Sequence, residues 1–534
     1  MYLSEIYKNF TYFNSTCKII RYSFVLYLIC ASSNFMRTGG GKMLNKRSAA
    51  VLTTVFFLSF LISFKAHGLT TSSLPKELSS ESKACIGCHS PTTIGIYQEW
   101  GKSKHFRANV GCYECHGKEK GAPGAFEHNG FTISVIVSPL DCGRCHGKEA
   151  NEFMNSHHGK ADRIIGSSDN TLAEMVEGNN GMKTEQFPKG ISAAAVNGCW
   201  QCHGGVIKVE KDGKLDPATW PNTGMGRVNP DGSEGSCTAC HQRHEFSAAQ
   251  AREPKTCGKC HQGPDHPQYE IYELSKHGIM YTYSAQKEMH LDSNKWIVGE
   301  DYTAAPTCAT CHMSATKNQS VTHDVGLRIK WNNRPAVSVL ANESDKMMGL
   351  PGAKITGDER EKNMKDVCTA CHEGNFVNNF YIQYNAELDL YNNKFAKPGL
   401  KLYNKATEVL KAVQGKEYAQ WSNKIDYTWF EIWHHQGRRA RHGASMMAPD
   451  YTQWHGNYEV AKDFYSEYIP ALREVIEKGK ASGNTDANKK AAELDAMLTD
   501  VLNSSDHKWS IGKEDPDITA ERLKRKAEFE QRYK

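Results

Sequence analysis

The sequence contains eight copies of the pentapeptide Cys-x-x-Cys-His between residues 85 and 372, and these copies use sixteen of its eighteen cysteines. This pattern attaches c-type haem, because the two cysteines form thioether bonds and the histidine binds the iron. The predicted attachment cysteines are Cys85, Cys88, Cys112, Cys115, Cys142, Cys145, Cys199, Cys202, Cys237, Cys240, Cys257, Cys260, Cys308, Cys311, Cys368 and Cys371. The predicted proximal iron ligands are His89, His116, His146, His203, His241, His261, His312 and His372.

Two other uses of paired cysteines fit this pattern less well. Zinc would need the pairs to combine into four-ligand sets, and it would not require a histidine at one fixed offset. A thioredoxin-like redox motif would occur once, in a βαβ setting. The sequence therefore predicts eight c-type haems as cofactors.

A haem that only transfers electrons needs a second strong axial ligand, usually a neutral imidazole nitrogen. Fifteen of the 23 histidines lie outside the motifs, which is enough to close seven haems with some left over. An ordinary core or surface histidine is the alternative at each position, and the spacing pairs none of them with a particular haem. The predicted distal ligands are His105, His128, His157 or His158, His244, His277, His323, and either His442 or His455.

The fourth motif, which runs from Cys199 to His203, is distinctive because its second residue is tryptophan. Here the chain resembles the octahaem hydroxylamine oxidoreductase family and, more distantly, the pentahaem nitrite reductases. In those reductases the five haems resemble the last five here, and the open-site motif begins Cys-Trp but ends in Lys. Besides the eight motifs, the resemblance rests on TWPNTGMGRVNPDG (219–232), GPDHPQ (263–268) and RRARHGASMMAPDYTQWHG (438–456).

The resemblance implies that the fourth haem is catalytic. This haem is attached at Cys199 and Cys202, its proximal ligand is His203, and its other axial position is open to substrate. Asp265 and His266 are similar to the family's acid–base pair above that haem. Such a pair suits the reaction, because oxidising hydroxylamine at iron releases a proton with each electron. Without the resemblance, adjacent aspartate and histidine would most often be a surface feature.

Tyr451 occupies the place of the family's cross-linking tyrosine. In those enzymes this tyrosine comes from a neighbouring subunit, bonds covalently to the catalytic macrocycle and distorts it, which tunes the iron toward oxidation. The resemblance therefore implies a homotrimer in which each haem site is completed by the next chain. On composition alone Tyr451 is one of 23 tyrosines, most of which simply pack by their rings.

The function implied is oxidation of hydroxylamine to nitric oxide or nitrite, with seven bis-histidine haems passing electrons to an external cytochrome c or similar acceptor. Hydrazine oxidation to dinitrogen is the nearest alternative. A second alternative is a nitrite reductase of the same architecture, although Tyr451 argues against this function. A third is a non-enzymatic electron-transfer cytochrome, in which all eight irons have two protein ligands and Asp265 and His266 are incidental.

Three regions must position these residues. Residues 69–150 hold three motifs and residues 151–375 hold five, whereas 376–534 hold none. Within the last region, apolar residues recur at four-residue steps over 459–478 and lie on one side of a helix near 486–502, which predicts two helices. Strand-like alternation is scarce. The predicted fold is mainly α: a multihaem cytochrome c with long haem-wrapping loops and a C-terminal helical bundle.

Segments 266–284 and 378–412 are further predicted helices. Pro470 falls inside the 459–478 pattern, where it would kink or break the helix. We expect the trimer contacts and the cross-linking tyrosine to lie in this C-terminal region.

The N-terminal part carries a targeting pattern. A basic segment begins at Met43, an apolar run covers 48–64, and small residues follow near Gly68, so 43–68 reads as a secretory signal peptide. Residues 1–42 are then a non-native upstream extension. A membrane anchor is the alternative, but the run is short for a spanning helix.

The targeting pattern predicts export to the periplasm or an equivalent lumen, and no membrane span in the mature chain. The absence of a C-terminal anchor resembles the soluble homologues of anaerobic ammonium oxidisers, in which that lumen is the anammoxosome. The formal net charge is +5. No basic cluster interleaved with aromatic residues is present, so we expect no nucleic-acid partner.

Overall fold

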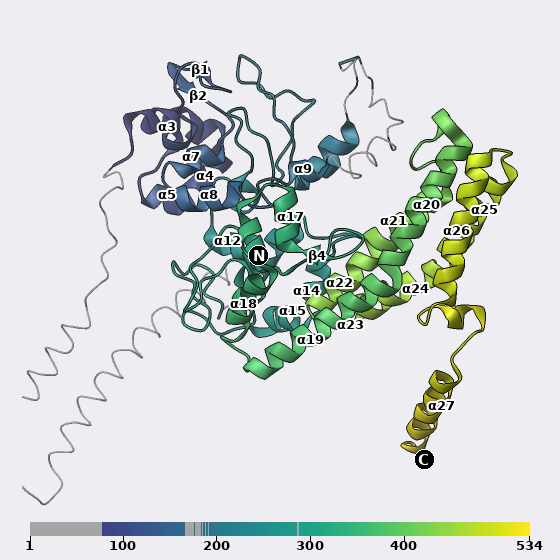
Figure 1. The fold of residues 1–534 in the computed structure, drawn as a ribbon. Coiled ribbons are helices and arrows are strands. Elements are labelled where there is room, and N and C mark those ends of the chain that lie inside the picture. Colours follow the sequence, from purple (N-terminus) through teal and green to yellow (C-terminus); the bar gives the residue numbers. More distant parts are fainter. Residues whose placement is uncertain are drawn as a thin grey trace, which may run out of the picture. The chain divides into compact units, whose positions relative to one another are not determined.

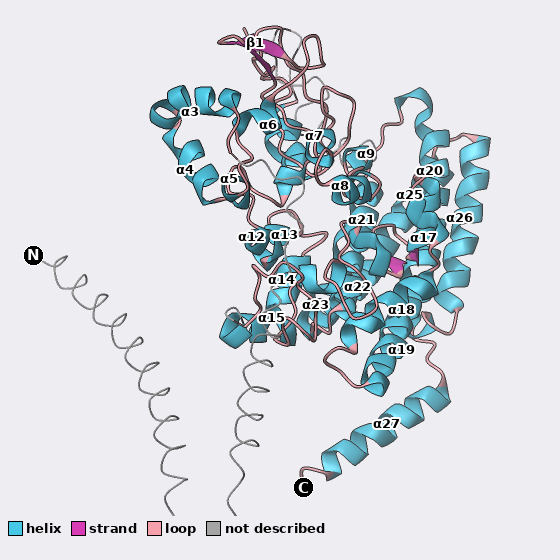
Figure 2. Ribbon diagram, turned by 90° about the vertical axis from the view of Figure 1, so that its left-hand side faces the viewer, coloured by secondary structure: helices cyan, strands magenta, loops and turns pink. Residues whose placement is uncertain are grey.

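Helices dominate the computed structural model of the protein, and its strands are short (Figures 1 and 2). The structure describes residues 77–165, 192–285 and 288–534, with a few single positions between 176 and 190. The predicted upstream extension and signal peptide lie outside these residues. In the described ranges no helix is both long enough and apolar enough to cross a membrane. The mainly α class is confirmed.

The first described part carries three motifs on short helices. Its elements are α3 (Ser80–Thr92), α4 (Ile94–Lys102), α5 (Lys104–Arg107), α6 (Cys112–His116), β1 (Phe126–His128), β2 (Phe131–Ile133), α7 (Pro139–Gly143), α8 (Gly147–Met154) and α9 (Asp162–Ile165). Polar caps help to keep the helices short. The Ser103 side chain, for example, accepts a hydrogen bond from the Phe106 amide and so begins α5 directly after α4 ends. β1 and β2 form an antiparallel hairpin.

The middle part holds the other five motifs. Its elements are η1 (Ala195–Cys199), α11 (Trp200–Cys202), η2 (Cys237–Ala239), α12 (Ala248–Arg252), α13 (Pro254–Gly258), α14 (Gln268–Leu274), α15 (Lys276–Met280), η3 (Tyr281–Ala285), α16 (Cys308–His312), η4 (Val325–Arg328), β3 (Trp331–Asn332), β4 (Val339–Leu340), α17 (Ala341–Met347), η5 (Pro351–Lys354) and α18 (Gly357–Cys368). Long loops connect the motifs, and residues 203–236 contain no helix. The predicted helix over 266–284 is divided, because Ser275 ends α14 and its side chain caps α15.

The C-terminal part is almost entirely helical. Its elements are α19 (Gly374–Tyr391), η6 (Asn392–Ala396), α20 (Lys397–Gln414), η7 (Gly415–Glu417), α21 (Lys424–Phe430), η8 (Glu431–Gln436), α22 (Gly437–Ser445), α23 (Pro449–Thr452), η9 (Gln453–Tyr458), α24 (Glu459–Asp463), η10 (Phe464–Tyr468), α25 (Ile469–Ala481), α26 (Thr485–Asn503), η11 (Lys508–Ile511) and α27 (Pro516–Gln531). The predicted helix near 486–502 is confirmed as α26. The predicted helix over 378–412 corresponds to α19, η6 and α20.

The largest apolar core of the described residues lies in this bundle. α20, α25 and α26 run side by side in both views (Figures 1 and 2). Leu402, Leu472 and Leu494, one from each helix, are fully buried between them. The core exists because the apolar positions of each helix share one face, as the four-residue spacing predicts.

Pro470 does not break its helix, so of the two outcomes predicted from the sequence the break is wrong. The helical stretch runs without interruption through α24, η10 and α25, with Pro470 in the first turn of α25. A proline inside an α-helix removes one hydrogen bond and clashes with the carbonyl four residues earlier. The preceding segment, η10, is a π-helix, whose wider turn relieves that clash.

The bundle core provides a test of the packing. Leu472→Ala should lower the free energy of unfolding by about 2–5 kcal/mol, because it leaves a cavity among fully buried side chains. Leu390→Ala is the matched control, since Leu390 is 48% exposed in α19. Guanidinium unfolding of the haem-containing protein, followed by far-ultraviolet circular dichroism, measures both changes. Equal losses in the two variants would contradict this core.

Candidate functional site

Histidines from six of the motifs lie opposite a histidine from another part of the chain. The distance between ring centroids is 6.0 to 6.5 Å in every pair. The pairs are His89 with His128, His146 with His105, His116 with His244, His261 with His158, His241 with His323, and His372 with His277. Two imidazoles that bind one metal ion from opposite sides have their nitrogens about 2 Å from it, so their centroids lie roughly 6 to 6.5 Å apart. The six pairs therefore fit an iron between the rings.

The motif histidines are also oriented for metal binding. Nδ1 of His116 lies 2.8 Å from the Ser134 carbonyl oxygen, and Nδ1 of His203 lies 3.3 Å from that of Ala161. A carbonyl oxygen can only accept, so Nδ1 carries the proton and Nε2 keeps the lone pair that a metal needs. The residues around these motifs therefore fit a haem iron on the Nε2 side.

Burial keeps the paired rings neutral, which is the form that binds iron. It lowers the pKa of His158 to about 3 and the pKa values of His241, His244 and His261 to about 4. The cause is the cost of placing an imidazolium cation away from water, to which neighbouring histidines add. These rings are therefore available as ligands at neutral pH.

Two predicted distal ligands are placed elsewhere. The ring nitrogens of His157 contact the carboxylate of Asp345 and, at 3.2 Å, the guanidinium of Arg334. His455 is about half exposed, and its Nδ1 lies 3.2 Å from a Glu459 carboxylate oxygen. Of the alternatives left open by the sequence, it is therefore His158, not His157, that faces a motif histidine.

His442, another predicted ligand, lies near the sixth motif. Its Nε2 is 3.4 Å from the amide nitrogen of Gln268, whose oxygen is 3.4 Å from Nδ1 of His261. Burial, with the nearby Arg441 and Arg438 cations, holds the pKa of His442 well below its usual value. His442 is therefore neutral, and the nearby histidines that help to lower its pKa are His266 and His261.

The motif cysteines form a continuous series, and none is in a disulfide. Burial raises the pKa of several of these thiols, and the thiols of neighbouring motifs raise it further, so sulfurs of different motifs lie close together. In the protein with haem attached, these thiols are thioether sulfurs. The pairs are Cys85 with Cys112, Cys115 with Cys142, Cys142 with Cys237, Cys240 with Cys257, Cys257 with Cys308, Cys311 with Cys368, and Cys202 with Cys260. These pairs connect neighbouring motifs in the order first, second, third, fifth, sixth, seventh and eighth. The fourth motif is a neighbour of the sixth.

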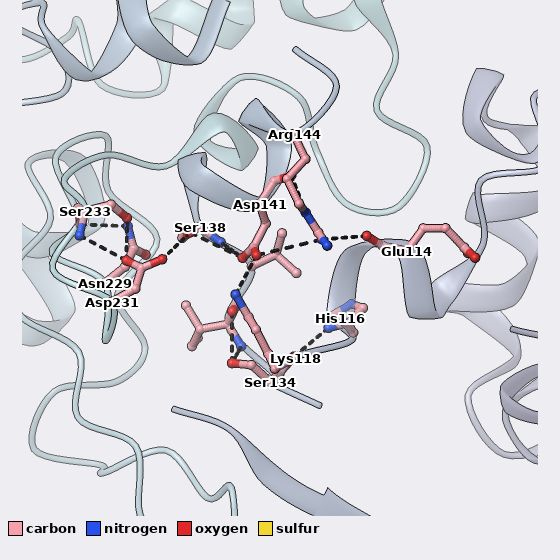
Figure 3. Close-up of polar contacts among 12 residues, drawn as sticks. Glu114, His116, Lys118, Ser134, Ser138, Asp141, Arg144, Asn229, Asp231 and Ser233 are labelled. Atoms are coloured by element: carbon pink, nitrogen blue, oxygen red, sulfur yellow. Dashed lines mark hydrogen bonds and ion pairs between the residues drawn. The ribbon is translucent and has the colours of Figure 1, made fainter. Parts of the chain in front are cut away.

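Ion pairs and hydrogen bonds fix the relative positions of the second, third and fifth motifs (Figure 3). Lys118, just after the second motif, has its Nζ 2.5 Å from a carboxylate oxygen of Asp141, just before the third. Ser138 donates from its hydroxyl to Asp231, in the loop that leads to the fifth motif, at 2.5 Å. Because these partners are far apart in sequence, the network holds three attachment sites in one arrangement.

The fourth motif is held by the glycine-rich stretch that follows it. The amides of Met225 and Gly226 donate to the carbonyls of Cys202 and His203 at 2.8 and 2.9 Å. A β-carbon at Gly224 would lie 2.1 Å from a backbone nitrogen, and one at Gly226 would lie 2.5 Å from another. Glycine is therefore required at both positions for the chain to approach the motif so closely.

Asp265 and His266 lie beside the fourth motif. Oδ1 of Asp265 is 2.5 Å from Nδ1 of His266, and Oδ2 is 3.1 Å from a guanidinium nitrogen of Arg438. Nε2 of His266 is 2.8 Å from the carbonyl oxygen of Cys260, the residue whose sulfur adjoins that of Cys202. The predicted acid–base pair therefore lies between the fourth motif, at Cys202, and the sixth, where the ring centroids of His266 and His261 are 6.1 Å apart.

The two members of this pair stabilise each other's charge. Burial alone would raise the pKa of Asp265, but His266, His434 and Arg438 outweigh it and hold that pKa well below its usual value. Burial alone would lower the pKa of His266, but Asp265 outweighs it and raises that pKa. The pair therefore favours its ionised form, a carboxylate beside an imidazolium, and in that form holds one proton.

The sequence prediction missed one neighbour of this pair. Nε2 of His434 lies 3.9 Å from Oδ2 of Asp265, and the His434 side chain is only 6% exposed. His434 belongs to η8, a π-helix far away in the sequence. Only its position shortly before the 438–456 stretch could have pointed to it.

Tyr451 lies in α23 with its side chain partly exposed. Its ring centroid is 5.5 Å from that of His455. Burial, together with the carboxylates of Glu270 and Asp450, raises its pKa, so the phenol stays protonated at neutral pH. Trp454, which follows in η9, is 61% exposed. The tyrosine therefore sits at a surface with aromatic character.

Comparison with known families agrees with this geometry. Residues 224–416 match the model for seven times multi-haem cytochrome CxxCH, 185–262 match cytochrome c7 and related cytochrome c, and 63–117 match cytochrome c554 and c-prime. A solved structure, a hypothetical multiheme protein, superposes with a TM-score of 0.61 at 25% identity, covering 78% of this chain and 100% of its own. The chain has the fold of a multihaem cytochrome c. The matches support c-type haems as its cofactors.

Three further proteins are also similar to the chain. A probable nitrite reductase-hydroxylamine oxidoreductase fusion protein of Kuenenia stuttgartiensis is 28% identical over 55% of the chain, and the C-type polyheme cytochrome OmcC of Geobacter sulfurreducens is 25% identical over 43%. The chain spans only 34% and 26% of the length of these two proteins. A reducing HAO-like protein complex of Kuenenia stuttgartiensis has a TM-score of 0.49 at 17% identity, covering 77% of this chain and 89% of its own.

The neighbouring histidines His157 and His158 provide a matched test. His158→Ala should add one high-spin haem to the spectrum of the cytochrome, because the His261 iron loses its second ligand. Added imidazole should convert that haem back to low spin. His157→Ala should leave the ligands of all haems unchanged. Electron paramagnetic resonance and optical spectra of both variants measure this; identical spectra would contradict the pairing.

Proposed function

We propose that this multihaem cytochrome oxidises a small reduced nitrogen compound, hydroxylamine first, at the haem attached through Cys199 and Cys202. The observation that carries the proposal is the Asp265–His266 pair beside that attachment point, held by Arg438. Such a pair has no evident role at a haem that only transfers electrons. The similarity to a protein named in part hydroxylamine oxidoreductase supports the same direction.

The chain's own residues must handle the protons of this reaction. When bound, a haem with an open axial position supplies a site for the nitrogen atom and accepts its electrons. Conversion to nitric oxide releases three protons with three electrons, and conversion to nitrite uses water and releases four electrons. Asp265 and His266 accept these protons in turn, and their ion pair keeps both groups aimed at one place. Arg438 fixes the carboxylate.

The other haems pass the electrons on. In this proposal the chain carries eight c-type haems, and seven of them have two histidine ligands. The six ring pairs close six of these seven. By elimination, we propose His442 as the distal ligand of the His312 haem, and burial keeps its imidazole neutral. The series of neighbouring motifs then leads electrons from the fourth haem, through the sixth, to an external cytochrome c or similar acceptor.

Tyr451 completes the proposed site from a neighbouring chain. The supporting observation is its position, partly exposed in α23 and followed by the exposed Trp454. A covalent bond to the macrocycle would join the chains into a homotrimer. We also propose export to the periplasm or an equivalent lumen, the anammoxosome if the protein comes from an anaerobic ammonium oxidiser.

Two other reactions would use the same residues. Hydrazine oxidation to dinitrogen also releases protons with electrons, so the acid–base pair serves it equally. Nitrite reduction would run protons in the opposite direction, and the name of the Kuenenia relative contains both activities. Assays with each substrate and identification of the product distinguish these reactions from one another and from a cytochrome without enzymatic activity.

Asp265 gives the main test of the proposal. Asp265→Asn should lower kcat for hydroxylamine oxidation by roughly 10²- to 10⁴-fold, because a base is lost. The wild-type rate should rise with pH through the raised pKa of His266, above 6.5, and this rise should move to lower pH in the variant. Steady-state rates against pH measure both effects. Asp292→Asn, at an exposed carboxylate, is the control. Unchanged rates in the Asp265→Asn variant would refute the role of Asp265 as a base.

Tyr451 is tested by denaturing electrophoresis with haem staining. The wild type should keep haem-stained material at the mass of three chains after boiling, because the cross-link is covalent. Tyr451→Phe should give single chains and lose most of the oxidising activity. Tyr458→Phe, at a half-exposed tyrosine one helical segment later, should behave as the wild type. Clean single chains from the wild type would rule out the cross-link.

A further inference from the structure

Asp265 has a neighbour, His434, that the proposed function does not use. Its Nε2 lies 3.9 Å from Oδ2 of Asp265, on the π-helical segment η8. The ring stacks on Phe430, with centroids 4.1 Å apart and an interplanar angle of 18°. π-helical turns within longer helices are frequent at functional sites. Packing alone would explain a phenylalanine at this position as well as it explains a histidine.

On its other side His434 approaches a second carboxylate. The rings of His434 and His435 have centroids 5.2 Å apart, and Nδ1 of His435 is 2.5 Å from a carboxylate oxygen of Glu431. The hydrogen bond from His435 is the main reason that the pKa of Glu431 is lowered. His434 lowers the pKa of Glu431 further, and it also lowers the pKa of Asp265. His434 thus lies within electrostatic range of both carboxylates.

Glu431 opens onto a surface cavity. The cavity has a volume of about 540 Å³ and is lined in part by Trp421, Glu431, His435, Asp463 and Glu467. Side-chain exposure rises from 6% at His434 to 21% at His435 and 46% at Glu431. Titratable groups therefore form a graded series from the acid–base pair to solvent.

We propose that His434 carries protons between Asp265 and this cavity. The inference rests on the proposed function, in which protons leave the substrate together with electrons. A proton on Oδ2 of Asp265 passes to Nε2 of His434, which leaves a carboxylate and an imidazolium. The imidazolium passes it to the His435–Glu431 pair, and water in the cavity takes it up. Only bonds to the proton change, and His434 returns to its neutral form.

The other groups that face Asp265 do not offer such a route. Arg438 stays protonated and cannot relay a proton. His266 is turned inward, with its Nε2 on the Cys260 carbonyl. The 3.9 Å gap at His434 is closed by a shift of about 1 Å or by one bridging water, either of which suffices for proton transfer. Electrons and protons then leave the site by separate routes.

The test replaces His434 and compares it with a matched histidine. His434→Phe keeps an aromatic ring against Phe430 but removes both nitrogens. His507→Phe is the control, because His507 is also buried and stacks on a phenylalanine, with centroids 5.3 Å apart, in the C-terminal bundle. Glu431→Gln, at a half-exposed position, is a second variant that leaves the interior unchanged.

Hydroxylamine turnover of the haem-containing protein is measured in water and in deuterium oxide, with and without added imidazole. His434→Phe should lower kcat about tenfold or more and enlarge the solvent isotope effect, with KM and the haem spectra unchanged. Imidazole should restore its rate by entering through the cavity, and Glu431→Gln should show a smaller loss. A wild-type rate, or a loss that imidazole does not restore, would overturn the proposal.

A separate measurement distinguishes failure of this inference from failure of the proposed function. If the wild type oxidises neither hydroxylamine nor hydrazine, the proposed function fails. Proton uptake after photoreduction of the haems, followed with a pH-indicator dye, requires no substrate. Slower uptake in His434→Phe than in the wild type and His507→Phe would still support the route. Equal rates in all three proteins would overturn it.

Discussion

The spacing between paired imidazoles is the constraint on which the rest of the structure depends. Each ring must lie about 3 Å from a shared centre to bind one iron, so the partners of a pair are fixed to within a few tenths of an ångström. Six pairs meet this requirement with rings from different parts of the chain. The short capped helices, the glycine contacts at the fourth motif and the Lys118–Asp141 network all hold ligands rather than build an apolar core. The main apolar core of the described residues is accordingly in the C-terminal bundle.

The sequence predicts the local features of this fold well. A haem motif is complete within five residues, and an amphipathic helix shows its buried face every turn, so both can be read without a structure. Ligand pairing is different, because it depends on distances between segments that no local pattern encodes. His157 and His158 illustrate the point: the choice between adjacent residues is made by Asp345, which lies far away in the sequence and engages His157.

The candidate site divides in the same way. Asp265 and His266 could be predicted through a family resemblance, whereas His434 could not. π-helical segments explain part of this difference, because each one shifts the register of the side chains that follow it and so defeats predictions based on a 3.6-residue period. The same device lets the helix continue through Pro470. Three of the π-helical segments lie at residues of the proposed site: η1 ends at Cys199, η8 contains His434, and η9 begins just after Tyr451. They therefore lie where the proposed chemistry needs unusual geometry.

The long sequence separation of the histidine pairs has a consequence for assembly. His116 is followed by the third, fourth and fifth motifs before its partner, His244, appears, and His241 is followed by the sixth and seventh motifs before its partner, His323. A chain that emerges from its N-terminus would therefore present the haems of these two motifs with a single axial ligand for as long as the distal segment is missing. Attachment and folding become one ordered process, in which later parts of the chain protect the cofactors of earlier parts from oxygen and stray ligands.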